Sequence, residues 1–222
     1  MDKQRPSPSL SPFGRSTEFQ EDVVGRPVGG TRERILDGAR AGLLDAGYAG
    51  LSTRRVADGA GVPLSQLHYH FGGKRQLILA VLARENERLI DRQTRMYGED
   101  RPLWQRYEQA CDFLDEDVAS GYVRVLQEMI AAGWADGDIA NAVRRLLNGW
   151  FQLLTEVAAE AERVHGQLGP FSAAELGTLI CLLFMGGESM LLLDLESEQV
   201  PIRQALRRFG ELIRQYETGE TT

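Results

Sequence analysis

The chain has 222 residues, which is enough for one larger domain or for two modest domains that share a core. Apolar residues make up 43% of it and charged residues 26%, as is ordinary for a soluble globular protein. The formal net charge of -7 argues at first sight against a nucleic-acid partner, so the distribution of that charge along the chain matters more than the sum.

Positive charge gathers in one segment. Residues 31–75 contain seven bases and four acids, a net charge of +3. Residues 1–30 carry four charges of each sign, which leaves 14 bases and 24 acids in residues 76–222. A mildly basic segment on an acidic body is the asymmetry expected of a DNA reader whose other half avoids phosphates.

Residues 1–30 are rich in Pro, Ser and Gly and lack periodicity, which predicts a disordered N-terminal extension. They contain no apolar run of the kind that a secretory signal needs, so we expect a cytoplasmic protein. Three arginines in this extension could contact a DNA backbone, although a solvated tail fits the composition better: Arg5, Arg15 and Arg26.

After this extension the apolar residues recur at helical spacing. Thr31 is a suitable N-cap for a first helix, which Gly47 should end. Ser52 begins a second, short helix that ends at Gly61. Pro63 suits the first turn of a third short helix, because the missing N–H of proline is not needed there.

Lys74 begins a long fourth helix, and five further helical patterns follow it, separated by Gly and Pro. No stretch alternates like a strand and no repeat stands out, so the expected fold class is all-α. The five patterns cover residues 102–118, 122–134, 138–165, 173–193 and 200–217.

The two short helices joined through Gly61 fit the plan of a helix-turn-helix, whose second helix enters the major groove while the first braces it across the backbone. Gly61 readily adopts the positive φ that the turn needs. Val56 and Ala57 should pack on Leu67, and the small alanine lets the helices approach closely. The leading end of the second helix would then face the base edges with Leu64, Ser65 and Gln66.

The run LSTRRVADGAGVPLSQLHYHFGGKRQL (51–77) resembles the signature of the TetR family of transcriptional regulators. That signature combines a small polar start, an alanine in the second helix, Gly-Val at the turn, an aromatic-rich Leu-x-x-x-Phe and a lysine that opens helix four. The resemblance implies a three-helix DNA-binding head over residues 31–78 and a helical ligand-sensing and dimerisation domain over residues 79–222. The positions in register are Leu51, Thr53, Val56, Ala57, Gly61, Val62, Leu67, Tyr69, Phe71 and Lys74.

The resemblance also implies roles for single residues. Thr53 would hydrogen-bond a phosphate, and Lys74 would grip another together with N–H groups of helix four. Arg54 would reach a base or the backbone. Ser65 and Gln66 would contact bases, because a glutamine amide can pair with N6 and N7 of adenine.

Three ring-bearing residues follow in the same helix. His68, Tyr69 and His70 would lie near phosphates, by the same resemblance. The two histidines are not expected to bind a metal, since residues i and i+2 of a helix point apart. Leu64 departs from the family, where a polar residue is common, and would touch a thymine methyl or simply pack.

In this family the last two helices pair with those of a second copy, which implies a homodimer through residues 173–193 and 200–217. Their apolar faces could equally be core within one chain. The middle helices of the family enclose a small-molecule pocket, and acids at positions 115 and 117 add no convincing charge-selective site to it. Its expected lining, each member of which could equally be core, is Trp104, Cys111, Met129, Trp134, Trp150, Phe151 and Phe184.

The longest apolar stretch, 176–195, contains Gly186, Gly187, Glu188 and Asp194. A membrane span needs about 20 apolar residues with few or no charges, so we interpret this stretch as a buried helix. The two cysteines of the chain, at positions 111 and 181, lie in apolar patterns and are expected to be buried thiols.

Together these features predict a transcriptional repressor that binds a palindromic DNA operator as a dimer and leaves it when a small-molecule effector binds. No nucleophile–base pair, metal cluster or Gly-rich phosphate loop points to an enzyme, and no cofactor is expected. An activator or another helical interaction protein with the same fold remains the alternative.

Overall fold

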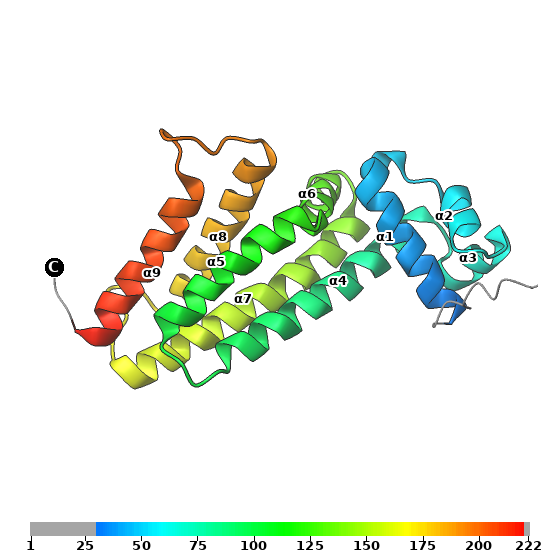
Figure 1. The fold of residues 1–222 in the computed structure, drawn as a ribbon. Coiled ribbons are helices and arrows are strands. Elements are labelled where there is room, and N and C mark those ends of the chain that lie inside the picture. The colour runs from blue at the N-terminus through cyan, green and yellow to red at the C-terminus, as the bar shows by residue number, and fades with distance from the viewer. Residues whose placement is uncertain (1–29, 220–222) are drawn as a thin grey trace, which may run out of the picture.

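The computed structural model describes residues 30–219, and every regular element in that range is a helix (Figure 1). The expected all-α fold class is therefore confirmed. The extension predicted over residues 1–30 lies outside the described residues except for Gly30. The helices are α1 (Thr31–Gly50), α2 (Thr53–Gly59), α3 (Leu64–Phe71), α4 (Lys74–Tyr97), α5 (Leu103–Ala119), α6 (Tyr122–Gly133), α7 (Gly137–His165), α8 (Ala173–Leu192) and α9 (Ile202–Thr218).

Helices α1–α3 form a compact head at one end of the molecule (Figure 1). Local signals set their ends: Gly47, at φ 67°, breaks the last turn of α1, and the Ser52 side chain accepts the backbone N–H of Arg55 to cap α2. Thr31 was expected to cap α1, but it is the first helical residue. The cap position is Gly30, and no side chain caps that end.

The turn of the head lies between α2 and α3. Gly61 has φ 62°, the left-handed region that costs a residue with Cβ about 1 kcal/mol or more. This turn brings Val56 and Ala57 of α2 into the same buried cluster as Leu67 of α3, which has no exposed surface. The predicted packing of the two helices is confirmed.

Helix α4 links the head to the remaining helices, which we call the body. Its first turns carry Leu77 and Ile78 into the core of the head, and its last turn carries Met96 and Tyr97 into a second core between α5, α7 and α8. Figure 1 shows α4 and α7 running along the molecule from the head toward α8 and α9. Because α4 is one continuous helix, a displacement of its end in the body would be transmitted to the head.

A second connection joins the head to α6. Arg124 donates from Nη2 to the carbonyl oxygens of Leu43 and Leu44, and Glu128 accepts the backbone N–H of Tyr48. These groups belong to the last turns of α1, around the break at Gly47. The side chains of α6 thus satisfy backbone groups that the end of a helix leaves without partners.

Helices α7 and α8 pack closely because Gly177 has no side chain. A Cβ at that position would lie 2.7 Å from the backbone nitrogen of Thr155 on α7. A capping box in which Ser172 and Glu175 exchange hydrogen bonds begins α8. The closely packed pair forms one wall of the body.

Helix α8 was interpreted as a buried helix, and this is wrong for a single chain. Only Gly177, Cys181 and Gly187 of α8 are buried, and Leu182 is 53% exposed. By length and composition alone α8 passes the test for a membrane-spanning helix, but a single such helix is weak evidence for a membrane protein. The apolar pattern shows that α8 has an apolar outer face, not what covers that face.

Candidate nucleic-acid interface and internal cavity

The leading turn of α3 presents side chains to solvent. Pro63 holds the cap position, and Leu64, Ser65 and Gln66 follow it on the surface, with Leu64 37% exposed. Leu67, the next residue, is completely buried. The helix therefore places its first turn outward while Leu67 and Phe71 anchor it to the head, as the sequence predicted.

The two predicted phosphate anchors are the first residues of the helices on either side of α3 in the chain, α2 and α4. Thr53 is the first residue of α2 and is half-buried, whereas Arg54 is exposed and has no acidic partner among residues 30–219. Lys74 begins α4, where its Nζ donates to the carbonyl oxygen of Ala49 at 3.0 Å and lies 5.2 Å from the centre of the Tyr48 ring. These two contacts hold the Lys74 side chain against the last turns of α1.

The rings of α3 differ in exposure. Tyr69 is 82% exposed, His68 is exposed, and His70 is half-buried. The Nδ1 atom of His68 lies 3.2 Å from the carbonyl oxygen of Gly72. Over the described part of the chain, no group of three or more His, Cys, Asp or Glu side chains is arranged to hold a metal ion.

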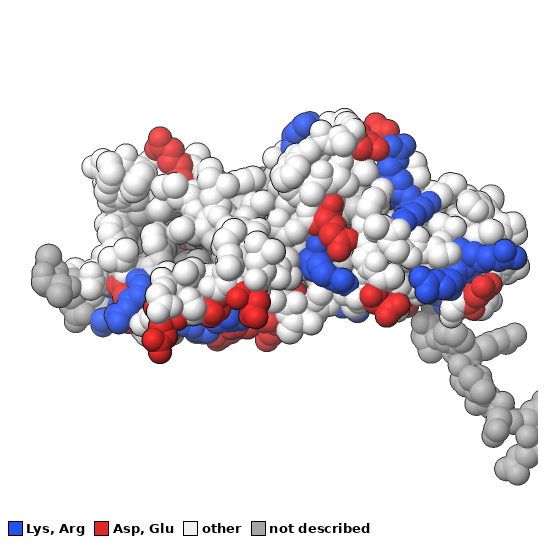
Figure 2. Space-filling model, turned by 90° about the horizontal axis from the view of Figure 1, so that it is seen from above, with Lys and Arg blue, Asp and Glu red and all other residues white. Residues whose placement is uncertain are grey.

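Basic side chains are visible over the head in Figure 2, with a few acids between them. The excess of basic over acidic side chains agrees with the net charge of +3 counted for residues 31–75. The exposed Arg54 and Arg55 of α2 belong to the same end of the molecule as the leading turn of α3. The head therefore combines an exposed polar turn with positive charge, which is what attraction to a phosphate backbone requires.

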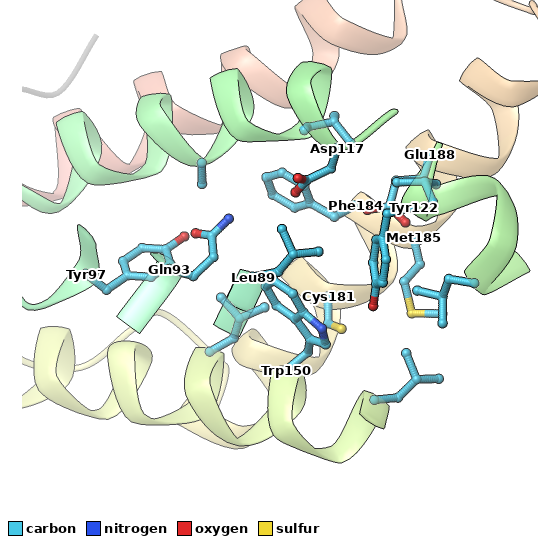
Figure 3. A pocket seen from close by; sticks show the side chains of 16 residues that line it. Leu89, Gln93, Tyr97, Asp117, Tyr122, Trp150, Cys181, Phe184, Met185 and Glu188 are labelled. Atoms are coloured by element: carbon cyan, nitrogen blue, oxygen red, sulfur yellow. The ribbon is translucent and has the colours of Figure 1, made fainter. Parts of the chain in front are cut away.

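Between the helices of the body lies a cavity that is partly open to solvent, with about 690 Å³ of unoccupied space including that open part, lined by 16 residues from α4, α5, α6, α7 and α8 (Figure 3). Trp150 and Phe184, two of the seven predicted pocket residues, line it. A second cavity of about 750 Å³ is almost wholly apolar and shares Tyr97 and Leu154 with the first. The middle helices thus form cavities, but most of the residues predicted to line a pocket do not line these two.

Five predicted pocket residues do not line either of these cavities. Trp134 follows the end of α6 and is 85% exposed, and Met129 is completely buried in the core shared by the head and α6. Cys111 is buried beside Tyr107 and Leu206, close to α9. Trp104 and Phe151 are half-buried, and Trp104 lines two other hollows, which also contain charged residues, near the start of α5.

Several polar residues at or next to the cavity were missed. Asn86 of α4 is buried beside the lining residues Tyr122 and Trp150, and its Oδ1 accepts the Tyr122 hydroxyl at 3.1 Å and the Trp150 indole N–H at 2.8 Å. Asp117 and Glu188 line the cavity itself, although no pattern in the sequence places them together. A polar residue at a core-facing position of an apolar pattern, such as Asn86 between Leu82 and Leu89, was the available signal.

Burial and a neighbouring acid change the chemistry of Glu188. Burial raises the pKa of its carboxyl group to about 8, and the charge of Asp117 adds to the shift. Burial likewise raises the pKa of Tyr122, and Glu188 is the next cause. Asp117 itself is paired with Arg92 at 2.6 Å, which counteracts the effect of burial on its own pKa.

Comparison with known proteins bears on the head. Residues 35–81 match the family model described as "Bacterial regulatory proteins, tetR family". We call residues 35–81 the TetR-type segment, because the likeness to this family covers these residues of the chain. All nine residues predicted to contact DNA fall within this TetR-type segment, whereas 13 of the 16 residues around the cavity lie beyond residue 97.

A curated relative supports the same assignment. The chain is similar to the HTH-type transcriptional repressor AcnR of Corynebacterium efficiens, with 41% identity over 61 residues. That match covers 28% of this chain and 31% of AcnR, so the chain aligns with about a third of the length of this relative. It therefore informs only a part of the chain.

Solved structures match over a greater length. A TetR transcription regulator from Haloarcula marismortui superposes with a TM-score of 0.69 at 18% identity, covering 82% of this chain and 95% of the other. The regulator FadR of Bacillus subtilis, solved in complex with stearoyl-CoA, gives a TM-score of 0.63 at 12% identity, covering 80% and 96%. At such low identity these likenesses establish a shared fold alone, which extends over both the head and the body.

Proposed function

We propose that this protein is a transcriptional repressor that binds a palindromic DNA operator as a homodimer and is released by a small-molecule effector. The observation that carries the proposal is the exposed leading turn of α3 on a basic head that matches the tetR family. The protein would act in the cytoplasm, and the proposal requires no catalytic group or cofactor.

The roles of single residues in the head are part of this proposal. Ser65 and Gln66 would read base edges from the first turn of α3, and Arg54 would reach a base or the backbone. Thr53 and Lys74 would fix the register of the head on phosphates. The exposure of Arg54, Ser65 and Gln66 supports their roles. Thr53 and Lys74 are half-buried at the first positions of α2 and α4, where N–H groups of the helix ends lie beside them.

The three ring-bearing residues of α3 complete the proposed contact surface. Tyr69, with most of its surface exposed, would extend toward the backbone, accompanied by His68 and His70. Leu64, which is 37% exposed at the first position of α3, would meet a thymine methyl group or simply pack.

A homodimer would form through α8 and α9. The outer face of α8 exposes Leu179, Leu182 and Leu183, and Leu212 of α9 is also exposed. Contiguous apolar surface of this kind marks interfaces in soluble proteins. Pairing with the same two helices of a second copy would cover this surface and place two heads on successive major grooves.

Release would follow from a shift between two conformations. Leu89, Gln93 and Tyr97 of α4 line the cavity, and the same helix enters the core of the head at Leu77. An effector that fits the cavity better when α4 is displaced would favour a head separation that no longer matches the operator.

Selection of bound sites from random DNA tests the DNA-binding part directly. We expect enrichment of a palindrome whose half-sites are separated by about one helical turn. A gel shift with the upstream DNA of the gene and a reporter assay then separate repression from activation. Failure to bind any palindromic site at low salt would overturn the proposal.

The release mechanism has its own test. Effectors found by thermal-shift screening should lower operator affinity in a gel shift. An effector that occupies the cavity and leaves operator affinity unchanged would contradict release by population shift, because a ligand shifts an equilibrium only by its differential affinity for the two states.

A further inference from the structure

The polar groups of the central cavity are unequally satisfied. Tyr122 and Trp150 donate to Asn86, so their donors are already used. Gln93 is only 6% exposed, and its side-chain oxygen has no hydrogen-bond partner. Among residues 30–219, Glu188 takes part in no hydrogen bond or ion pair, while Asp117 has one cationic partner, Arg92. Gln93 and Glu188 therefore each bring to the cavity an acceptor oxygen that no donor of the described residues satisfies.

The charge of the cavity points the same way. Two of its 16 lining residues, Asp117 and Glu188, are acids, and none is Lys, Arg or His. Arg92, the nearest base on the other side of Asp117, is shared between Asp117 and Glu116 and stacks on the ring of Phe113 at 4.0 Å. Its charge is thus committed to α5, and the Glu188 carboxylate has no counter-ion.

The remaining surface of the cavity is apolar and aromatic. Figure 3 shows Trp150, Tyr122 and Phe184 around the space into which Asp117 and Glu188 bring their carboxylates, with Gln93 and Tyr97 toward the other end. Aromatic faces attract cations in addition to burying apolar groups. A carboxylate or phosphate ligand would instead meet the unpaired Glu188 and would find no Lys, Arg or His among the lining residues to balance its own charge.

We propose that the effector of this protein is an organic cation: an apolar, ring-bearing molecule whose protonated nitrogen pairs with Glu188 in the central cavity. A second donor on the ligand would satisfy the unpaired oxygen of Gln93. This inference rests on the proposed function, because it assigns a chemical class to the effector of the same regulator.

A matched series of probes tests the charge preference: 4-phenylbutylamine, 4-phenylbutanol and 4-phenylbutanoate. They share one ring and chain and differ in the terminal group, which is cationic, neutral or anionic. Binding to the full chain is measured by isothermal titration calorimetry, at a pH above about 8 so that the Glu188 carboxyl group is ionised. We expect the amine to bind about ten- to a hundredfold more tightly than the alcohol, and the carboxylate to bind most weakly.

Substitution of Glu188 identifies the group responsible. Glu188→Gln should reduce the preference for the amine over the alcohol to about threefold or less and leave alcohol binding nearly unchanged. The matched control is Glu198→Gln, which removes the same charge from an exposed position between α8 and α9 and should keep the preference. We expect Glu188→Gln to fold, since it removes an unpaired acid from beside Asp117.

The outcomes separate this inference from the proposed function. Equal affinity for the three probes, a preference for the carboxylate, or an amine preference that survives Glu188→Gln would each overturn the cation assignment. Operator binding in a gel shift is measured in parallel and does not depend on those results. If the amine binds through Glu188 but no palindrome is bound, the proposed function fails while the assignment of the cavity stands.

Discussion

The head and the body use their apolar side chains differently. In the head, α1, α2 and α3 meet around a single core, which α4, α6 and α7 complete and in which Ile35, Leu36 and Leu67 have no exposed surface. In the rest of the body, the helices divide their apolar residues among several smaller clusters and leave two cavities between them. The same kind of residue thus fills space in one region and lines empty space in the other.

This difference relates structure to the proposed roles. A filled core fixes the position of each surface side chain, and the leading turn of α3 needs such precision to read bases. A cavity lowers the packing density around α4, so ligand occupancy can change the position of that helix. On this proposal the head keeps one conformation, whereas the body changes conformation when a ligand binds.

The largest expected effect comes from emptying the core of the head. Leu67→Ala should lower the free energy of unfolding by about 2–5 kcal/mol, because it removes a completely buried side chain from the centre of the cluster. Urea denaturation followed by circular dichroism measures this loss. The half-exposed Leu64 provides the control in the same helix: Leu64→Ala should change stability by less than about 1 kcal/mol. Equal losses for the two would contradict the filled-core description.

The next largest effect concerns the joint between the two regions. Arg124→Ala removes the donors to the carbonyl oxygens of Leu43 and Leu44 and should cost about 1.5–3 kcal/mol of stability. It should also weaken the response of operator affinity to an effector without changing effector affinity. The control is Arg145→Ala, at an exposed position of α7. An unchanged response in Arg124→Ala would show that α6 does not transmit the signal.

Helix ends were predictable in both regions because their signals are local. The pattern predicted a helix over 122–134, and α6 covers Tyr122–Gly133, since Gly121 at φ 78° precedes it. The packing of Leu67 and the exposure of Gln66 in the head also followed from spacing. There a short turn between two short helices leaves few ways to bury the apolar residues.

The lining of the cavity was less predictable because it depends on contacts between distant helices. Trp134 continues the apolar pattern of α6, yet it follows the last turn and faces solvent. Glu188 was interpreted only as an interruption of an apolar stretch. Its place in the cavity beside Asp117 of α5 and Gln93 of α4 depends on how three helices pack. Helical periodicity within one segment does not predict that packing.

A smaller effect is expected at the reading surface, where stability should not change. Gln66→Ala should relax the preference at one base position of each half-site, at a cost of about 1–3 kcal/mol for the preferred base. Binding to operators that carry each of the four bases at that position measures it. Gln76→Ala, at an exposed position outside α3, should leave every preference intact. Loss of affinity by the same factor on all four operators would exclude a base contact.

The smallest effect should come from Lys74, because its role is to attract rather than to discriminate. Lys74→Ala should weaken binding to all sequences alike and flatten the dependence of log affinity on log salt by about one unit. Part of the loss could instead arise in α1, since Lys74 donates to the carbonyl of Ala49 at its end. Lys74→Arg keeps the charge and should restore the salt dependence, whereas Lys74→Gln should not. If Lys74→Ala and Gln66→Ala behaved identically on matched and mismatched sites, the division of the head into anchors and readers would be wrong.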